Sequence, residues 1–367
     1  MVDSEGTAPA VRSAQLVSIQ HLRGIAALFV VIFHLKAPLA KMGYHGFWLP
    51  GLSAGVDIFF VISGFIMWVT TFGRTVAPGA FMRKRLARIV PIYWLLTTFV
   101  VVVLLIAPSL VQSGRIVPAH VIASYLFLPY VHPVIGGVEP VVPVGWTLNL
   151  EMLFYVVFAV ALLLPPRPRF VVVALFMIGL SALGLVLRTP PGTLSGFYLS
   201  SIMVEFVTGM ALGVLASSTT LLARPPAWIG AAVTVVCLVW LSVTPGSTHF
   251  RFLHWGILAT LIVAGALVVE ARGRLPTLPP LRLIGDASYS LYLTHFLALS
   301  AAGQVWRKLG LGGSIVGRTV FCVLATLACL AVAILCYRLI EQPLGRLFAG
   351  HTDRHRTDVH GIEVLRG

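Results

Sequence analysis

Charged residues are scarce in this 367-residue chain: they make up 10% of it, whereas soluble domains carry about 25%. Hydrophobic residues make up 58% of the chain. They gather in runs of helix-spanning length, without the alternation that is typical of the strands of a membrane barrel. The shortage of charge argues against a soluble globular protein. It predicts an all-α, polytopic membrane protein.

Cysteine is also rare, and its pattern argues against two kinds of site. Cys322, Cys329 and Cys336 recur every seven residues, which places neighbours about 10 Å apart along a helix, too far for a disulfide. No CxxC pair is present, so we predict no metal site and no permanently bound cofactor. The net charge of +14 is explained by basic loops of a membrane protein, and we predict no nucleic-acid partner.

Ten apolar segments are predicted to span the membrane. The stretch 117–131 is apolar but short and ends in prolines, so we predict an interfacial or re-entrant segment there. If it spans instead, there are eleven helices and the C-terminus moves to the other side. No cleavable signal precedes the first segment, which we therefore expect to remain as an anchor. The predicted spans are 18–36, 52–72, 86–107, 145–164, 170–187, 199–216, 228–244, 252–270, 284–303 and 316–340.

The distribution of Lys and Arg predicts the orientation. With the N-terminus inside, 17 of these residues fall in inner segments and 8 in outer segments. The positive-inside rule then favours both termini in the cytoplasm. The predicted organisation is a cytoplasmic N-terminal segment over 1–17, a transmembrane domain over 18–343 and a short tail over 344–367, which we expect to be disordered.

The first predicted span, "QHLRGIAALFVVIFHLK", carries two ionisable residues, Arg23 and His34. Such residues are costly inside a membrane and mark functional positions by default. Eleven residues turn a helix by three turns plus about 20° and advance it by about 16 Å. Arg23 and His34 are therefore predicted to share one helix face, near the inner and outer ends.

Other ionisable residues are predicted to join His34 in the middle and outer parts of the membrane: Asp57, Glu151 and His295, each from a different span. Each has a simpler alternative. Asp57 can cap its helix N-terminus, His34 can reach the interface, and His295 can hydrogen-bond a neighbouring helix. Glu151 lies too deep for a cap, with Tyr155 one turn on.

Two arginines and two further residues complete the set of candidates. Arg85 and Arg88 lie three positions apart, on one face at the inner end of the third span, where their alternative role is to enforce topology. Tyr292 neighbours His295 on the ninth span. Gly64, seven residues after Asp57, is predicted to let a neighbouring helix or a ligand approach closely.

These residues belong to a series of motifs, and the chain resembles acyltransferase family 3, especially its exopolysaccharide-production branch of O-acetyltransferases. The resemblance covers about 18–343 and rests on the order and spacing of the motifs. They are "LRGIAALFVVIFH", "GVDIFFVISGFIM", "FMRKRLARIVPIYW", "GWTLNLEMLFY", "SYSLYLTH" and the closing "EQP".

The resemblance implies transfer of an acyl group, commonly acetyl, from cytoplasmic acyl-CoA to a carbohydrate hydroxyl at the membrane or its outer side. It implies a multi-pass protein of the bacterial plasma membrane, with acyl-CoA as co-substrate. Acyl-CoA, a carbohydrate acceptor and the lipid bilayer are the expected partners, and polysaccharide-assembly proteins are candidates. Some members carry a C-terminal esterase-like domain, for which the predicted tail is too short.

The predicted roles follow from the resemblance and from general chemistry. His34 is the general base or, less favourably, a transient acyl carrier, with Glu151 or Asp57 as catalytic partner. Arg85 and Arg88 are predicted to bind the CoA phosphates. The list of predicted donor- or acceptor-binding residues is completed by Arg23, His295 and Tyr292.

Two rival functions remain open at the level of sequence. Buried His, Asp, Glu and Arg also suit a transporter or flippase for a lipid-linked sugar. No inverted repeat or matched pair of broken helices supports that function. A structural or assembly protein with degenerate catalysis is the third hypothesis, which the complete set of motif residues argues against.

Overall fold

The computed structural model describes residues 16–108, 114–246, 250–273 and 275–346, and in these ranges the fold is all-α, as predicted. A single isolated antiparallel bridge joins Val131 and Val138 in a loop. Most of the predicted N-terminal segment and tail, residues 1–15 and 347–367, lies outside the described residues.

Ten long helices correspond one to one with the ten predicted spans. They are α1 (Val17–His34), α3 (Gly55–Thr71), α4 (Pro78–Ile106), α6 (Trp146–Ala161), α7 (Pro166–Leu187), α9 (Val204–Ser218), α10 (Ala227–Val243), α11 (Ile257–Ala271), α13 (Ser288–Lys308) and α14 (Ile315–Cys336). The shorter helices are α2 (Lys36–Lys41), α5 (Pro118–Tyr125), α8 (Leu194–Tyr198) and α12 (Pro279–Asp286). Short 3-10 turns are η1 (Pro50–Ala54), η3 (Pro143–Gly145), η4 (Ser201–Met203) and η5 (Leu221–Ala223), and π-helical turns are η6 (Phe252–Gly256) and η7 (Tyr337–Glu341).

Eight of the described helices are long and apolar enough to cross a membrane, with adjoining turns included. Helix α10 is shorter at 17 residues, and α13 is long enough but carries several polar residues. The chain is thus a multi-pass membrane protein. The count of ten spans and the cytoplasmic location of both termini stay predictions.

The segment 117–131 contains only the eight-residue helix α5. At 1.5 Å per residue, α5 is about 12 Å long, far less than a bilayer requires. It packs against α4, where the Phe127 and Tyr93 rings are 4.7 Å apart and Trp94 Nε1 donates to the Tyr125 carbonyl at 2.9 Å. The structure therefore favours a non-spanning segment over an eleventh membrane helix.

Several predicted helix boundaries differ from the structure by four or more residues, and two of them concern the candidate site. The third span begins at Pro78 rather than 86, so Arg85 and Arg88 both lie within α4, with Pro91 inside the same helix. The ninth span was predicted from 284, but α12 ends at Asp286 and α13 begins at Ser288. Helix α12 has Pro279 in its first turn and packs against α1.

Helices α3 and α9 meet through paired glycines. A Cβ added to Gly64 would lie 2.0 Å from the Phe206 carbonyl oxygen, and one added to Gly209 would lie 2.0 Å from that of Val61. Only glycine allows backbones to approach so closely. The prediction that Gly64 admits a neighbouring helix is confirmed.

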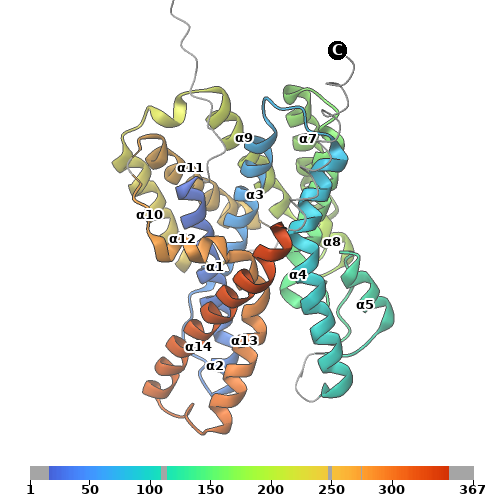
Figure 1. Ribbon diagram of the computed structural model, residues 1–367, viewed down its shortest axis with the longest axis vertical. Coiled ribbons are helices and arrows are strands. Elements are labelled where there is room, and N and C mark those ends of the chain that lie inside the picture. Colours follow the sequence, from blue (N-terminus) through green and yellow to red (C-terminus); the bar gives the residue numbers. More distant parts are fainter. Residues whose placement is uncertain (1–15, 109–113, 247–249, 274, 347–367) are drawn as a thin grey trace, which may run out of the picture.

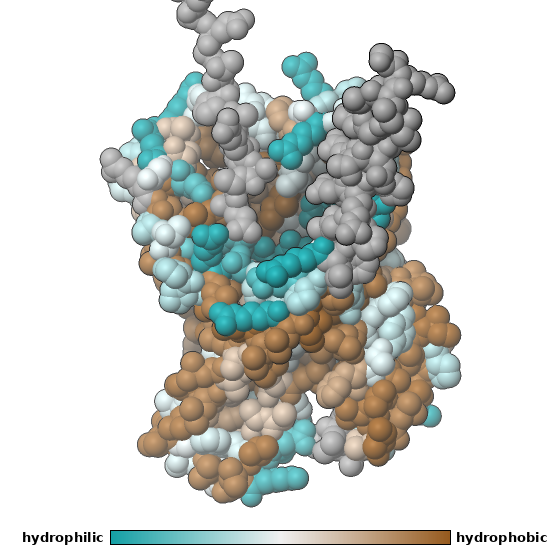
Figure 2. All heavy atoms as spheres, in the orientation of Figure 1, coloured by the Kyte–Doolittle hydropathy of each residue, from teal (hydrophilic) through white to brown (hydrophobic). Residues whose placement is uncertain are grey.

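Helices α1 and α3 lie near the centre of the molecule, with α4 along one side and α10 and α11 on the other (Figure 1). Helices α13 and α14 form much of the lower part of this view. Figure 2 shows apolar residues over most of that lower half, and hydrophilic residues across the middle, where α12 and the end of α14 lie.

Candidate active site

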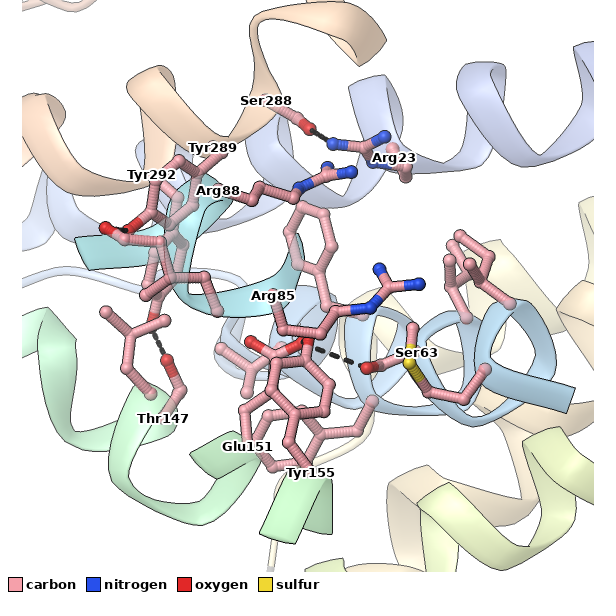
Figure 3. Close-up of a pocket in the computed structure, with 18 residues that line it drawn as sticks. Arg23, Ser63, Arg85, Arg88, Thr147, Glu151, Tyr155, Ser288, Tyr289 and Tyr292 are labelled. Atoms are coloured by element: carbon pink, nitrogen blue, oxygen red, sulfur yellow. Dashed lines mark hydrogen bonds between the residues drawn. The ribbon is translucent and has the colours of Figure 1, made fainter. Parts of the chain in front are cut away.

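A pocket of about 750 Å³, part of it open to solvent, lies among α1, α3, α4, α6 and α13. We call it the arginine pocket because Arg23, Arg85 and Arg88 line it. Figure 3 shows their guanidinium groups approaching the same space from α1 and α4, with Glu151 and Tyr155 of α6 below them in this view. Arg23, Arg85, Arg88, Glu151 and Tyr292 were all predicted site residues, and the structure brings these five together.

None of the three arginines forms an ion pair with a carboxylate in the described part of the chain. Arg23 donates to Ser288 Oγ at 2.9 Å and to Gln20 Oε1 at 3.3 Å, both neutral groups. The Arg85 guanidinium lies over the rings of Phe81, at 5.4 Å, and Tyr155, at 5.9 Å. Among the described residues that line the pocket, Glu151 is the single acidic one, so the pocket is a positively charged recess suited to a polyanion.

Glu151 is held by two hydroxyl groups. Ser63 Oγ donates to Glu151 Oε1 at 2.9 Å, and the Tyr155 hydroxyl donates to the same oxygen. Ser63 comes from α3, whereas Tyr155 lies one turn further along α6. These bonds fix the carboxylate in the pocket wall, opposite the arginines.

Tyr292 joins the arginine pocket to a pair of histidines. Its hydroxyl donates to the Val144 carbonyl at 2.8 Å and accepts from Thr147 Oγ1 at 3.0 Å, which ties α13 to the start of α6. Its ring lies 6.0 Å from that of His295 and 6.1 Å from that of Phe59. Tyr292 therefore lines the pocket and has the His295 ring as a neighbour.

His34 and His295 contact each other directly, with 3.3 Å between His34 Nδ1 and His295 Nε2. His34 Nδ1 is also 2.8 Å from the Val30 carbonyl, and His295 Nδ1 is 3.1 Å from the Leu291 carbonyl. A carbonyl oxygen only accepts, so each Nδ1 carries the proton and each neutral ring keeps its lone pair on Nε2. His295 Nε2 can then accept from His34, which leaves His34 Nε2 as the basic atom.

The shared face predicted for Arg23 and His34 is confirmed, because both contact α13, through Ser288 and His295. No hydrogen bond joins His34 to Glu151 or Asp57 among the described residues. Asp57 instead accepts two hydrogen bonds from Arg251, at 2.9 and 2.6 Å. The catalytic roles of these residues stay predictions.

One residue of this region, Arg251, was missed by sequence reasoning. Arg251, counted as an outer-loop charge, pairs with the completely buried Asp57 beside a second buried carboxyl, Glu205. A carboxylate inside a membrane needs a partner. The position of Asp57 within a predicted span was therefore the signal that a cation such as Arg251 should be sought for it. The "EQP" motif likewise has a partner, because Ser290 Oγ donates to Glu341 Oε2 at 2.6 Å.

A family model described as an acyltransferase domain matches residues 16–338. The exopolysaccharide production protein ExoZ of Rhizobium meliloti is 38% identical over 297 residues, which cover 80% of this chain and 90% of that protein. The peptidoglycan O-acetyltransferase OatA of Listeria monocytogenes is 24% identical, over 92% of this chain and 58% of its own length. The O-acetyltransferase OatA of Staphylococcus aureus is 25% identical, over 77% of this chain and 50% of its own. The chain thus spans about half the length of these two OatA proteins. No solved structure matches the chain.

Proposed function

Because the chain belongs to the acyltransferase domain family, we propose that it is an integral-membrane O-acyltransferase that modifies a carbohydrate. Its acceptor is a hydroxyl of an extracytoplasmic or lipid-linked carbohydrate, such as an exopolysaccharide, in keeping with the name of the ExoZ relative. Its donor is acyl-CoA, with acetyl as the transferred group, supplied from the cytoplasm. The site of action is the plasma membrane of a bacterium.

The observation that carries the proposal is the arginine pocket beside the histidine pair. The nucleotide end of CoA is polyanionic, and arginines recognise phosphate through bidentate hydrogen bonds. Arg85 and Arg88 hold that end, and Arg23 adds a third cation near Ser288. The pantetheine arm then runs along the pocket toward Tyr292, whose ring meets His295.

The chemical step uses His34 as a general base. Its Nε2 takes the proton from the acceptor hydroxyl while the hydroxyl oxygen attacks the thioester carbonyl carbon. The tetrahedral intermediate collapses, the carbon–sulfur bond breaks, and the CoA thiolate leaves. The same proton passes from His34 to the thiolate sulfur, so the products are the ester and CoA. His295 is a positioning residue that holds the His34 ring through Nδ1.

The donor side is tested with purified protein and labelled acetyl-CoA. Arg85→Ala with Arg88→Ala should raise KM for acetyl-CoA at least about tenfold, because charged hydrogen bonds are lost. Arg74→Ala with Arg167→Ala removes the same charge from exposed positions outside the pocket and should leave KM unchanged. An unchanged KM in the Arg85/Arg88 variant would assign those arginines to topology.

The base is tested in the same assay. His34→Ala should lower kcat by about 10²- to 10⁴-fold, the usual contribution of a general base, whereas His45→Ala, an exposed histidine, should not. Undiminished transfer by His34→Ala would refute the assignment. If the wild-type protein forms no acetylated product from acetyl-CoA, transport of a lipid-linked sugar becomes the better hypothesis.

A further inference from the structure

A second pocket, of about 560 Å³ including open solvent, borders His34. It is built from one face of each of two helical segments. On α1 and α2 the lining residues lie at positions 34, 37, 38 and 41, and on α13 they lie at 296, 299, 300, 303, 304 and 307. Both sets follow the i, i+3, i+4 spacing of a single helix face, so the pocket is a groove between two neighbouring faces.

A close approach of α2 and α13 fixes the groove. A Cβ added to Gly303 would lie 2.9 Å from Pro38 Cβ, so a larger residue would separate the two segments. Lys41 follows Pro38 by three residues, and Arg307 follows Gly303 by four. The contact therefore brings both cations to the same end of the groove, where Arg307 Nε donates to the Gly303 carbonyl at 3.3 Å.

The two ends of the groove differ in chemistry. His34 lies at one end, with its Nδ1 turned to Val30 and His295. Lys41 is seven residues further along, about 10 Å away by helical rise, and shares its end with Arg307. Between them Phe296 offers a ring, and Ser300 and Gln304 offer polar groups.

Among the residues that the structure describes, no Asp or Glu lines the groove. The sequence ranges 35–49 and 296–318, which carry both walls and their connections, contain five Lys or Arg residues and no acidic residue. An anionic ligand therefore meets an attractive field with no opposing carboxylate in these segments.

We propose that this groove binds the acceptor, and that the acceptor is an anionic glycan whose acidic group is held by Lys41 and Arg307 while its hydroxyl reaches His34. The separation of about 10 Å between His34 and Lys41 exceeds the width of a single sugar ring. The acidic group therefore belongs to a sugar unit next to the one whose hydroxyl reaches His34. A glycan carboxylate and the phosphate of a lipid carrier share the required chemistry. This inference rests on the proposed function for the role of His34, but the groove's preference for anions is testable without catalysis.

The test is a calorimetric titration of the full-length protein in detergent with three probes: hexagalacturonate, neutral maltohexaose and a polyprenyl phosphate. Hexagalacturonate or the polyprenyl phosphate should bind more tightly than maltohexaose, and the tighter of the two identifies the source of the anion. Lys41→Gln with Arg307→Gln should weaken anion binding at least about tenfold. The matched control is Lys36→Gln with Lys308→Gln, which removes the same charge from exposed residues outside the groove and should change the affinity by less than twofold.

Two results would overturn the inference. One is that maltohexaose and both anions bind with equal affinity, or that none of the three probes binds. The other is an equal loss in the two double variants, which would mean that general surface charge attracts the anion. Acetyl transfer gives the separate readout for the proposed function. If anions bind in the groove but no acetyl product forms, the proposed chemistry fails while the binding site stands.

Discussion

Replacing Arg251 by Gln should destabilise the protein strongly, because it leaves a carboxylate buried without its cation. The Asp57 side chain is 0% exposed, and Arg251 binds it through two hydrogen bonds of 2.9 and 2.6 Å. Removing one partner of a buried ion pair costs about 3–5 kcal/mol. A second buried carboxyl, that of Glu205, lies beside Asp57.

Replacing the other partner of the pair, by Asp57→Asn, should cost less unfolding free energy. In Asp57→Asn, Arg251 keeps Glu205 nearby, remains 18% exposed and borders a solvent-open pocket. Its guanidinium also stays 4.7 Å from the Trp255 ring, a favourable cation–π contact. The double variant should be more stable than the sum of the two single losses predicts, by roughly 1–3 kcal/mol.

The assay is unfolding in mixed micelles by an SDS titration, which gives the free energy of unfolding of each variant. An Arg251→Gln loss below about 1 kcal/mol, or strictly additive effects, would refute this account of a buried pair. Activity per folded molecule separates stability from chemistry. If Asp57→Asn folds but transfers acetyl far more slowly than wild type, the predicted catalytic role of Asp57 gains support.

Two further substitutions test the packing and the α5 loop. Gly64→Ala should cost about 1–3 kcal/mol of unfolding free energy, because its Cβ would meet the Phe206 carbonyl. Gly179→Ala, whose added Cβ would have no atom within 4 Å, should be neutral or stabilising. Equal effects of the two substitutions would contradict the close-packing argument. Burial and nearby His120 lower the pKa of His132 to about 4, and the His132 Nδ1 accepts hydrogen bonds from the amides of Val134 and Ile135. Because His132 takes up a proton more readily in the unfolded chain, the stability of the protein should fall as the pH drops from about 6.5 toward 4. His132→Asn keeps an acceptor without a titrating group and should flatten this dependence in unfolding-temperature measurements between pH 7 and 5; a slope identical to wild type would exclude His132 as its source.

Periodicity and the membrane's demand for long apolar helices were enough to predict the ten long helices of the fold. They were also enough to place Arg23 and His34 on one face of α1, and Arg85 and Arg88 on one face of α4, because each pair lies within a single helix. The start of α4 was missed because Arg83, Lys84 and Arg85 interrupt the apolar run, although charged residues continue a helix without difficulty beyond the bilayer.

Relations between helices were predicted less well. The sequence marks Asp57, Glu151, His34 and His295 as membrane-embedded, but it does not state which of them meet. The His34–His295 contact and the Asp57–Arg251 pair depend on how α1, α3, α13 and η6 pack, and on loops that bring distant segments together. The groove beside His34 depends on the meeting of Gly303 and Pro38, for which neither helix carries a signal alone.

The arginine pocket has a consequence for the protein without a ligand. Three guanidinium groups share the pocket with one carboxylate, so they repel one another when no anion is bound. Any polyanion that fills the pocket removes part of this repulsion and stabilises the folded state by mass action. If the proposed acyl-CoA donor is this polyanion, it would stabilise the protein as well as serve as its substrate, and the lifetime of the protein in the membrane would depend on the supply of acyl-CoA.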